Sequence, residues 1–381
     1  MQKILIPVGL AVGIGAGWLI YAGAYAERYA SRPIELAPIV HAKYDPTKIE
    51  REIALHESRV TNDPEGAIGF AILSGAYLAK SREQDDDASS WKAEEAARTS
   101  LAIRRRGNIQ GAMKLVQAML EQHRFQDSLK AVDDALRVSP GDDQAKLLRA
   151  DVLIELGRNE DARKQLEQVE IKDPTFMAVK ARWQSANGDH LGSLATWKRA
   201  VQDLEKMSHI GEEFIAWYQV KAGSELLKLG KPSDARILYE TAFAMAPRSY
   251  KASLGIAEAA FADGKWKEAV ISCDKTLAMV NSFRAMAVRG RALEKMGDLN
   301  GAKSQFAKMH EAFLEEDSRY SKMGKGGPLG VRHPDREFAT FCAESGMFPV
   351  DGLRAAKRDI LNRPDELAKS NLAKLQQTIS G

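Results

Sequence analysis

Apolar and small residues recur along most of the chain at the three- and four-residue spacing of an α-helix. One such run is Ala162, Leu166 and Val169. Four later runs have the same spacing: Ser193, Trp197 and Ala200; Ala235, Tyr239 and Ala242; Ala269, Cys273 and Thr276; and Ala302, Phe306 and Met309. This pattern predicts a series of helices that each bury one face.

Every run begins inside a recurring phrase, in which a glycine is followed five positions later by a small residue. The phrase starts at six positions: Gly157, Gly230, Gly264 and Gly297, with weaker copies at Gly188 and at His123, where histidine takes the place of glycine. In three copies a proline follows twelve positions after the small residue, and Pro140 and Pro174 are 34 residues apart. The chain is therefore a repeat protein.

The phrase has a physical meaning in a helical hairpin. Glycine ends a helix in the left-handed conformation, and the small residue after it lets a second helix approach the first closely. The proline cannot continue a helix, so it separates one hairpin from the next. One hairpin has too little apolar surface to fold alone, so neighbouring hairpins are expected to stack and share a core.

These positions resemble the tetratricopeptide repeat family. Small residues also stand where that family has glycine or alanine in the first helix of each unit: Ala150, Ala181, Gly223, Ala257 and Gly290. The resemblance covers most of the chain after about residue 64 and implies an all-α fold, an α-solenoid whose hairpins form a right-handed superhelix. Arg149 and Arg289 replace the leucine of the family, so we expect their stems to pack and their guanidinium groups to reach water or a carboxylate.

The residues before the clear repeats predict a first hairpin and a cap. Residues 65–80 and 91–105 are expected to be its helices, joined by a turn that residues 81–90 lengthen. Asp45 and Pro46 are expected to open a capping helix, as its cap and its first-turn proline.

The residues after the clear repeats predict a degenerate last hairpin and a closing helix. The hairpin spans residues 335–346 and 351–363, and the closing helix spans residues 366–379. Three leucines of the closing helix are expected to cover the last hairpin: Leu367, Leu372 and Leu375. We thus expect eight hairpins and two caps, divided as follows: 1–33, membrane segment and linker; 34–64, first cap; 65–316, repeat array; 317–334, glycine-rich loop; 335–381, last hairpin and final cap.

The N-terminus predicts a membrane helix. Residues 4–26 carry no charge, and as a helix they would extend about 34 Å, enough to cross a hydrocarbon core of about 30 Å. Their length favours an uncleaved anchor over a removed signal, although residues 24–26 fit a cleavage site. Gly9, Gly13 and Gly17 share one helical face, which allows a homodimer through this segment; the alternative is that glycine is simply common in such helices.

The rules for membrane orientation disagree here. Lys3 and the free amine before an apolar run are typical of an exported anchor, whereas Arg28 and Arg32 just after it favour a cytoplasmic repeat domain. We favour the extracytoplasmic face of a bacterial inner membrane. The alternatives are the cytoplasmic face and export after cleavage.

Composition indicates no nucleic-acid partner. The 55 basic and 52 acidic side chains leave a net charge of +3 over 381 residues. The tight basic cluster at residues 104–106 is expected to be a solvated helix end. It does not form the basic stripe that nucleic-acid binding requires. Cys273 and Cys342 lie inside predicted helices, so we expect buried free thiols.

Three short motifs resemble active or metal sites but are incomplete. Residues 310–311 begin as a zinc-protease helix does, but Leu314 stands where the second histidine is needed. Residues 324–327 lack the residues that complete a phosphate loop. Residues 85–87 lack the glycine and glutamate of a calcium loop and are expected to cap the following helix. We therefore expect neither an enzyme nor a cofactor or metal.

The resemblance places the binding surface on the concave face, formed mainly by the first helix of each hairpin. The positions expected to face it are Gln117, Glu121, Asp151, Glu155, Arg182, Ser224, Lys228, Glu258, Arg291 and Lys295. Carboxylates come early and basic groups late, which suits an extended peptide of opposite polarity, although exposed helix faces are commonly charged. Few of these positions match the asparagine and lysine of the family's carboxylate clamp, so no clamp is expected.

We therefore expect a non-catalytic, membrane-tethered scaffold that binds protein or peptide partners in the assembly of an envelope complex. One alternative is an accessory subunit of an enzyme complex, with residues 324–333 completing the partner's active site. Another is a receptor for a small ligand or saccharide. Such a receptor would need inward-facing aromatic rings, whereas Trp197, Tyr239 and Trp266 map to second-helix or turn positions.

Overall fold

The computed structural model describes residues 43–84, 86–208, 210–322 and 334–380, which lie in one compact unit, His41–Gly381. Every regular element among these residues is a helix, and they comprise eighteen α-helices and one 3₁₀-helix, η1 (Pro174–Phe176). The all-α fold is thus confirmed for this part of the chain. No helix within it is long and apolar enough to cross a membrane. The predicted membrane segment at residues 4–26, with Gly9, Gly13 and Gly17, lies outside the described residues.

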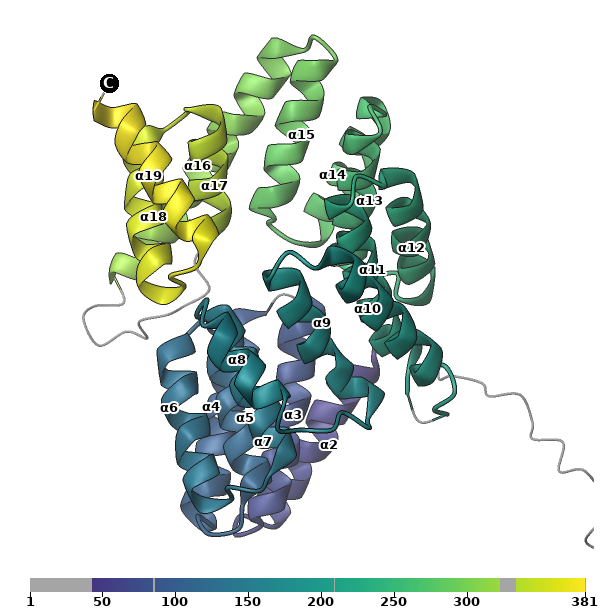
Figure 1. Cartoon of the computed structure of the whole chain (residues 1–381), viewed down its shortest axis with the longest axis vertical. Coiled ribbons are helices and arrows are strands. Elements are labelled where there is room, and N and C mark those ends of the chain that lie inside the picture. The colour runs from purple at the N-terminus through teal and green to yellow at the C-terminus, as the bar shows by residue number, and fades with distance from the viewer. Residues whose placement is uncertain (1–42, 85, 209, 323–333, 381) are drawn as a thin grey trace, which may run out of the picture. The chain divides into compact units, whose positions relative to one another are not determined.

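The helices pair in the order of the chain, as the colour gradient of Figure 1 shows. Eight hairpins follow one another: α3 (Ala67–Gln84) with α4 (Asp87–Ile103), α5 (Ile109–Glu121) with α6 (Phe125–Val138), α7 (Asp143–Glu155) with α8 (Asn159–Leu166), α9 (Met177–Ala186) with α10 (His190–Leu204), α11 (Glu212–Lys228) with α12 (Pro232–Met245), α13 (Tyr250–Ala262) with α14 (Trp266–Met279), α15 (Phe283–Lys295) with α16 (Leu299–Lys322), and α17 (Asp335–Ser345) with α18 (Pro349–Asn362).

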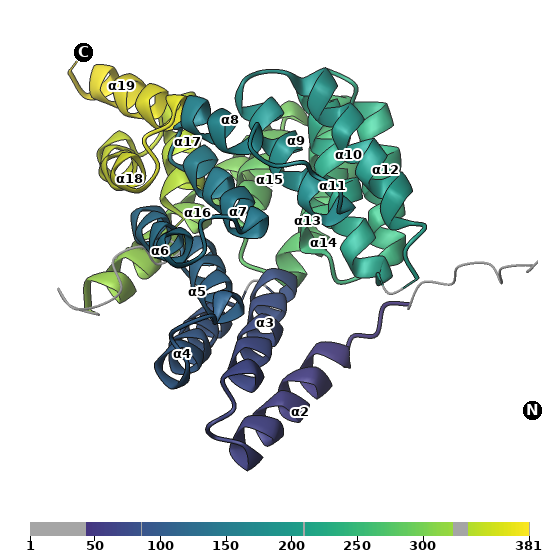
Figure 2. The ribbon, with the colours of Figure 1, turned by 60° about the horizontal axis from the view of Figure 1, so that its bottom comes forward.

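Two single helices flank the hairpins. Helix α2 (Lys48–Asn62) packs on α3, and helix α19 (Glu366–Ser380) packs on α17 and α18. First helices of successive hairpins also contact each other, and Figure 2 shows α3, α5 and α7 side by side. Each hairpin therefore buries its apolar face against its neighbours, as a repeat architecture requires.

The turn predicted at each copy of the phrase is confirmed. All six starting positions adopt the left-handed conformation, with φ between 56° at His123 and 83° at Gly297. His123 adopts this conformation despite a side chain that glycine lacks, and its ring stacks on Phe125 with 5.5 Å between centroids. The small residues five positions later are all buried: Ser128, Ala162, Ser193, Ala235, Ala269 and Ala302.

Small residues in the first helices make room for aromatic rings from the second helices. A Cβ at Gly223 would lie 2.9 Å from Cε1 of Tyr239, and a Cβ at Gly255 would overlap the same ring. The ring of Phe306 fills the corresponding space at Gly290. The predicted small positions therefore fix how closely neighbouring helices pack.

Aromatic side chains form much of the core between hairpins. Trp197 on α10 meets Trp217 and Tyr218 on α11 edge to face, at 5.6 and 5.3 Å between centroids. Phe313 on α16 stacks on Phe338 of α17 at 3.9 Å. Each such pair adds about 0.5–1.5 kcal/mol to the stabilisation from buried area.

The two arginines that depart from the family pattern behave as expected. Arg149 Nε donates a hydrogen bond to Asp133 at 2.6 Å, and Arg289 Nε donates one to Asp274 at 2.7 Å. Both side chains are about three-quarters buried, with exposed fractions of 23% and 26%. Their stems pack in the leucine positions, and their charged ends reach carboxylates of the preceding second helix.

The predicted long turn at residues 81–90 is wrong. Helix α3 continues to Gln84 and helix α4 begins at Asp87, so most of this stretch is helical. Ser81, Ser89 and Ser90 are buried there, and tertiary packing outweighs their weak helix preference. The first capping helix begins later than predicted: Asp45 accepts a hydrogen bond from Thr47 N, and α2 starts only at Lys48.

The C-terminal half departs from prediction at two places. Helix α16 runs to Lys322, so the first part of the loop predicted at residues 317–334 is helical, while residues 323–333 lie outside the described residues. On α19, Leu375 is buried as expected, but Leu367 is 44% exposed. Ala368 and Asn371 share the buried face with Leu375, because their spacing of three and four residues keeps them on one side.

Candidate functional site

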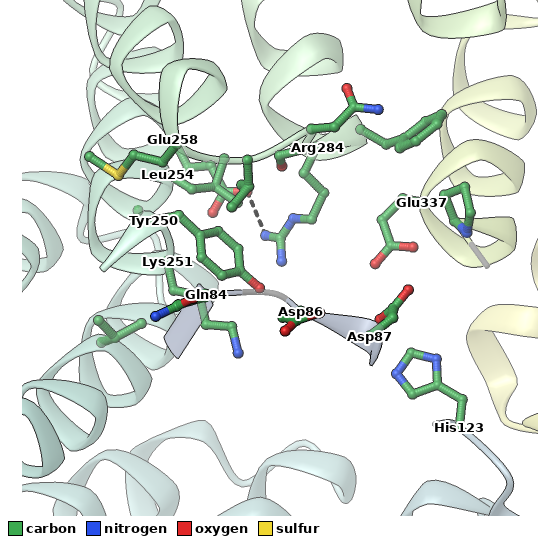
Figure 3. Close-up of a pocket in the computed structure, with 18 of the residues that line it drawn as sticks. Gln84, Asp86, Asp87, His123, Tyr250, Lys251, Leu254, Glu258, Arg284 and Glu337 are labelled. Atoms are coloured by element: carbon green, nitrogen blue, oxygen red, sulfur yellow. Dashed lines mark hydrogen bonds and ion pairs between the residues drawn. The ribbon is translucent and has the colours of Figure 1, made fainter. Parts of the chain in front are cut away.

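A cavity of about 700 Å³ lies against the first helices of three successive hairpins, α11, α13 and α15. Its other walls come from the junction of α3 and α4, from His123 and from the start of α17 (Figure 3). The cavity thus brings together parts of the chain from the first, second and later hairpins. Its volume falls in the range of ligand-binding sites.

Three basic side chains enter this cavity from consecutive first helices: Lys221 from α11, Lys251 from α13 and Arg284 from α15. Arg284 donates a hydrogen bond of 2.5 Å to Glu258, drawn as a dashed line in Figure 3. Lys221 has no hydrogen bond or ion pair with any described residue, and its Nζ lies 5.3 Å from the centroid of the Trp217 ring. One cation of the cavity wall is therefore uncompensated.

The pKa of Lys221 is lowered from 10.5 to about 7. Burial is the largest cause, because the protein around the ammonium excludes the water that would stabilise its charge. The charges of Lys251, Arg182 and Arg284 lower the pKa further, and Glu155 opposes them. At neutral pH this lysine is thus close to its titration midpoint.

The side of the cavity facing the basic residues carries carboxylates. Asp86 and Asp87 come from the junction of α3 and α4, and Glu337 comes from α17 (Figure 3). Asp86 also caps α4, since its side chain accepts a hydrogen bond of 3.0 Å from Ala88 N, as expected from the sequence. The cavity therefore has a basic wall and an acidic wall.

A network of ion pairs lies next to the basic wall. Arg182 on α9 pairs with both Asp151 and Glu155 on α7. Arg363, just after α18, approaches Glu155 from the other side, with 2.8 Å between Nη2 and Oε2. The guanidinium of Arg363 also lies 4.7 Å from the centroid of the Phe125 ring.

The turn between α18 and α19 packs against Gly157, next to the pair of Arg363 and Glu155. A Cβ built on Gly157 would lie 3.2 Å from Cα of Asp365 and 3.4 Å from the carbonyl oxygen of Pro364. Arg336 holds the turn from behind, with hydrogen bonds to Asp359 at 3.2 Å and to Asp365 at 2.9 Å. The end of the last hairpin is therefore docked on the turn of the third hairpin.

The two carboxylates of the network titrate in opposite directions. Burial raises the pKa of Asp151, and its pairing with Arg182 only partly offsets this. Burial also acts on Glu155, but Arg363 and Arg182 together outweigh it and lower the pKa to about 2. Glu155 is thus held as a carboxylate by two cations.

The structure distributes the ten predicted groove residues over several environments. Ser224 and Glu258 line the cavity, and Asp151, Glu155 and Arg182 form the adjacent network. The remaining five lie elsewhere: Glu121 pairs with Arg82, Lys228 with Glu225, and Arg291 with Glu344, while Gln117 accepts a hydrogen bond from Lys114 and Lys295 is exposed.

Sequence reasoning missed the basic wall, although each of its residues lies one or two helical turns before a predicted groove residue. Lys221 lies three residues before Ser224, Lys251 seven before Glu258, and Arg284 seven before Arg291. These spacings keep each pair on one helical face. Tyr239 is predicted to lie away from the inner surface, yet it is among the residues that line the cavity, although its side chain is almost fully buried.

The remaining chemical motifs have structural roles where the structure describes them. His310 Nε2 lies 2.8 Å from Asp351 Oδ2, and the His310 ring stacks on Phe348. No group of three or more potential metal ligands occurs in the described ranges. Cys273 and Cys342 are buried free thiols, as predicted, and burial raises the pKa of each to about 12.

Two segments match sequence models of the tetratricopeptide repeat: residues 105–185 and residues 220–282. These two segments of the chain are therefore tetratricopeptide repeats. The second segment includes α13 and the C-terminal half of α11, so Lys221 and Lys251 of the basic wall lie in a recognised repeat. Tetratricopeptide repeat proteins are protein-interaction scaffolds. No curated protein matches the chain.

Several solved structures resemble this chain distantly. PilW, described as a widely conserved type IV pilus biogenesis factor, is 16% identical, with a TM-score of 0.47 over 55% of this chain and 95% of that one. A tetratricopeptide repeat protein from Parabacteroides merdae is 16% identical (TM-score 0.43, 62% and 92% covered), and PilF of Pseudomonas aeruginosa is 13% identical (0.44, 56% and 97%). At these values the likeness assigns none of their roles to this chain.

Proposed function

We propose that this protein is a non-catalytic scaffold that holds an extended segment of a partner protein in the cavity beside α11, α13 and α15. The observation that carries the proposal is the set of three successive first helices that present polar side chains to one cavity. A strand of peptide laid across them would meet a new helix at each step, as repeat surfaces allow. No step of chemistry is required of these residues.

The proposed scaffold is tethered to a membrane by residues 4–26, with the repeats on the extracytoplasmic side, where it takes part in assembling an envelope complex. The uncharged length of this segment supports the tether. The spacing of Gly9, Gly13 and Gly17 supports a homodimer through it. Both parts are independent of the cavity and are tested separately.

Photo-crosslinking in the native cell tests the cavity as the binding site. A photoreactive amino acid at Ser224 or Met279 would face the cavity, whereas the same group at Ile237, 61% exposed on α12, would not line it. We expect one partner protein to crosslink to both cavity positions and not to position 237. Equal crosslinking at position 237, or none at either cavity position, would contradict the proposal.

One observation favours a second candidate, a receptor for a small ligand or saccharide. Tyr239 and Tyr250 both line the cavity, and Figure 3 shows Tyr250 among its lining side chains. Aromatic rings beside polar groups suit a sugar or an aromatic ligand. A rise in Tm of the full chain with one member of a saccharide panel, lost in Tyr250→Ala, would favour this candidate over the scaffold.

A further inference from the structure

The packing of the described residues leaves the ammonium of Lys221 without a hydrogen-bond or ion-pair partner. A lysine at the protein surface reaches water with its ammonium, but this one is only partly exposed inside the cavity, against the ring of Trp217. A desolvated charge without a partner is unfavourable, so buried lysines are ordinarily paired. A ligand in the cavity can supply the missing partner.

The charges around Lys221 show which sign of ligand the site accepts. Arg182 is neutralised by Asp151 and Glu155, and Arg284 by Glu258. Lys251 on the neighbouring helix adds a second positive charge to the same wall. The charge of Lys221, which has no hydrogen-bond or ion-pair partner among the described residues, is therefore positive and faces the cavity.

We propose that Lys221 and Lys251 form a subsite that binds an acidic side chain, aspartate or glutamate, of the extended partner segment. This inference rests on the proposed scaffold function and adds the charge pattern of its ligand. The carboxylate would accept hydrogen bonds from two ammonium groups on adjacent helices, a charge-assisted contact in a poorly hydrated place. The contact would also link α11 to α13 through the ligand.

The opposite wall limits what else the segment contains. Asp86, Asp87 and Glu337 share the cavity with the two lysines, so a uniformly acidic segment would be repelled there. The fitting segment carries an acidic residue toward α11 and α13, and neutral or basic residues toward α17. This pattern distinguishes the subsite from a general attraction for anions.

Selection from peptide libraries tests the subsite even while the partner is unidentified. The immobilised full chain in detergent is incubated with random octapeptides whose C-termini are amidated, and with the same library bearing free C-termini. Three proteins are compared: the parent, Lys221→Met and Lys221→Arg. Lys221→Met removes an unpaired charge and keeps the stem length, and Lys221→Arg keeps the charge.

We expect the parent to select amidated peptides with one aspartate or glutamate, binding about tenfold more tightly than the same peptides with asparagine or glutamine, the effect of one well-placed charged contact. Lys221→Met should lose this preference and Lys221→Arg should retain it. Three results would overturn the inference while leaving the scaffold intact. The selected peptides could show no preference for acidic residues, or Lys221→Met could show the same preference as the parent. The preference could also be confined to peptides with free C-termini. Failure of the parent to select any peptide would count against the proposed function itself, and the inference would fall with it.

Discussion

Arg363, the residue after α18, lies 2.8 Å from Glu155 at the end of α7, and so joins the last hairpin to the third. Both side chains are mostly buried, each with an exposed fraction of 19%. The same guanidinium covers the ring of Phe125, and the neighbouring Asp365 contacts Gly157. This corner is one of the places where residues far apart in the sequence hold the repeat array together.

Arg363→Ala should destabilise the protein by about 1–3 kcal/mol, because it leaves a buried carboxylate with one cation instead of two. The change should also raise the pKa of Glu155. In the parent, Glu155 stabilises the fold at pH values above its ordinary pKa of 4.5. This stabilisation is lost as the pH falls through the folded-state pKa of about 2. Urea unfolding at pH 7 and pH 3 measures both effects.

The matched control is Arg163→Ala, which removes an arginine from exposed pairs on α8. Exposed pairs contribute little, so its unfolding midpoint should equal that of the parent. A midpoint for Arg363→Ala equal to that of the control would show that the corner does not stabilise the fold.

Lys221→Met should stabilise the protein at pH 6, on the order of 1–2 kcal/mol, because the folded state holds this charge poorly. The folded pKa of about 7 lies below the ordinary 10.5, so the folded parent binds fewer protons than its unfolded chain between these values. The stability of the parent therefore rises with pH across this window, and its deficit against Lys221→Met should shrink by pH 9. Lys267→Met, at an exposed position of α14, should show no such trend.

Gly290→Ala should destabilise the protein by about 1–3 kcal/mol, since its Cβ would overlap the ring of Phe306. Gly141→Ala is the control, because a Cβ there meets nothing within 4 Å. Thermal unfolding of the two variants should differ in Tm by several degrees. Combining Gly290→Ala with Phe306→Leu should recover part of the loss, and strict additivity of the two changes would argue against the overlap.

The proposed tether predicts that the full chain stays in the membrane pellet after carbonate extraction. A chain without residues 1–40 should be released, because the apolar segment is absent. Western blotting of pellet and supernatant distinguishes the two. Release of the full chain, or appearance of a shortened chain in the culture medium, would instead indicate a peripheral or an exported protein.

The proposed homodimer predicts a separate result in a membrane two-hybrid assay. Gly13→Ile should weaken self-association of the full chain, because a large side chain prevents close approach of two helices. Ala11→Ile, outside the glycine face, is the control. Equal signals from parent and Gly13→Ile would exclude this interface.

The hairpins could be predicted because their signals are local. A left-handed turn at Gly230 and a buried Ala235 are set by backbone sterics within one hairpin, and both follow from one phrase of sequence. The stretch at residues 81–90 failed because its serines and aspartates favour turns, whereas contacts with neighbouring helices decide its conformation.

The cavity could be predicted only in part, because its shape depends on the sum of the small rotations between successive hairpins. The face carrying Ser224 and Glu258 followed from the family pattern, and extending it by one or two turns would have found Lys221 and Lys251. The acidic wall at Asp86 could not have been found in this way. It faces α11 only because hairpins that are distant in sequence meet in space.

The docking of Asp365 on Gly157 has a consequence for biosynthesis. A ribosome releases the third hairpin long before it adds the residues that cover that turn, so a growing chain cannot yet make this contact. During translation the corner stays undocked, and of its two arginine partners Glu155 has only Arg182 beside it. This corner can therefore form only after residues 363–365 have left the ribosome.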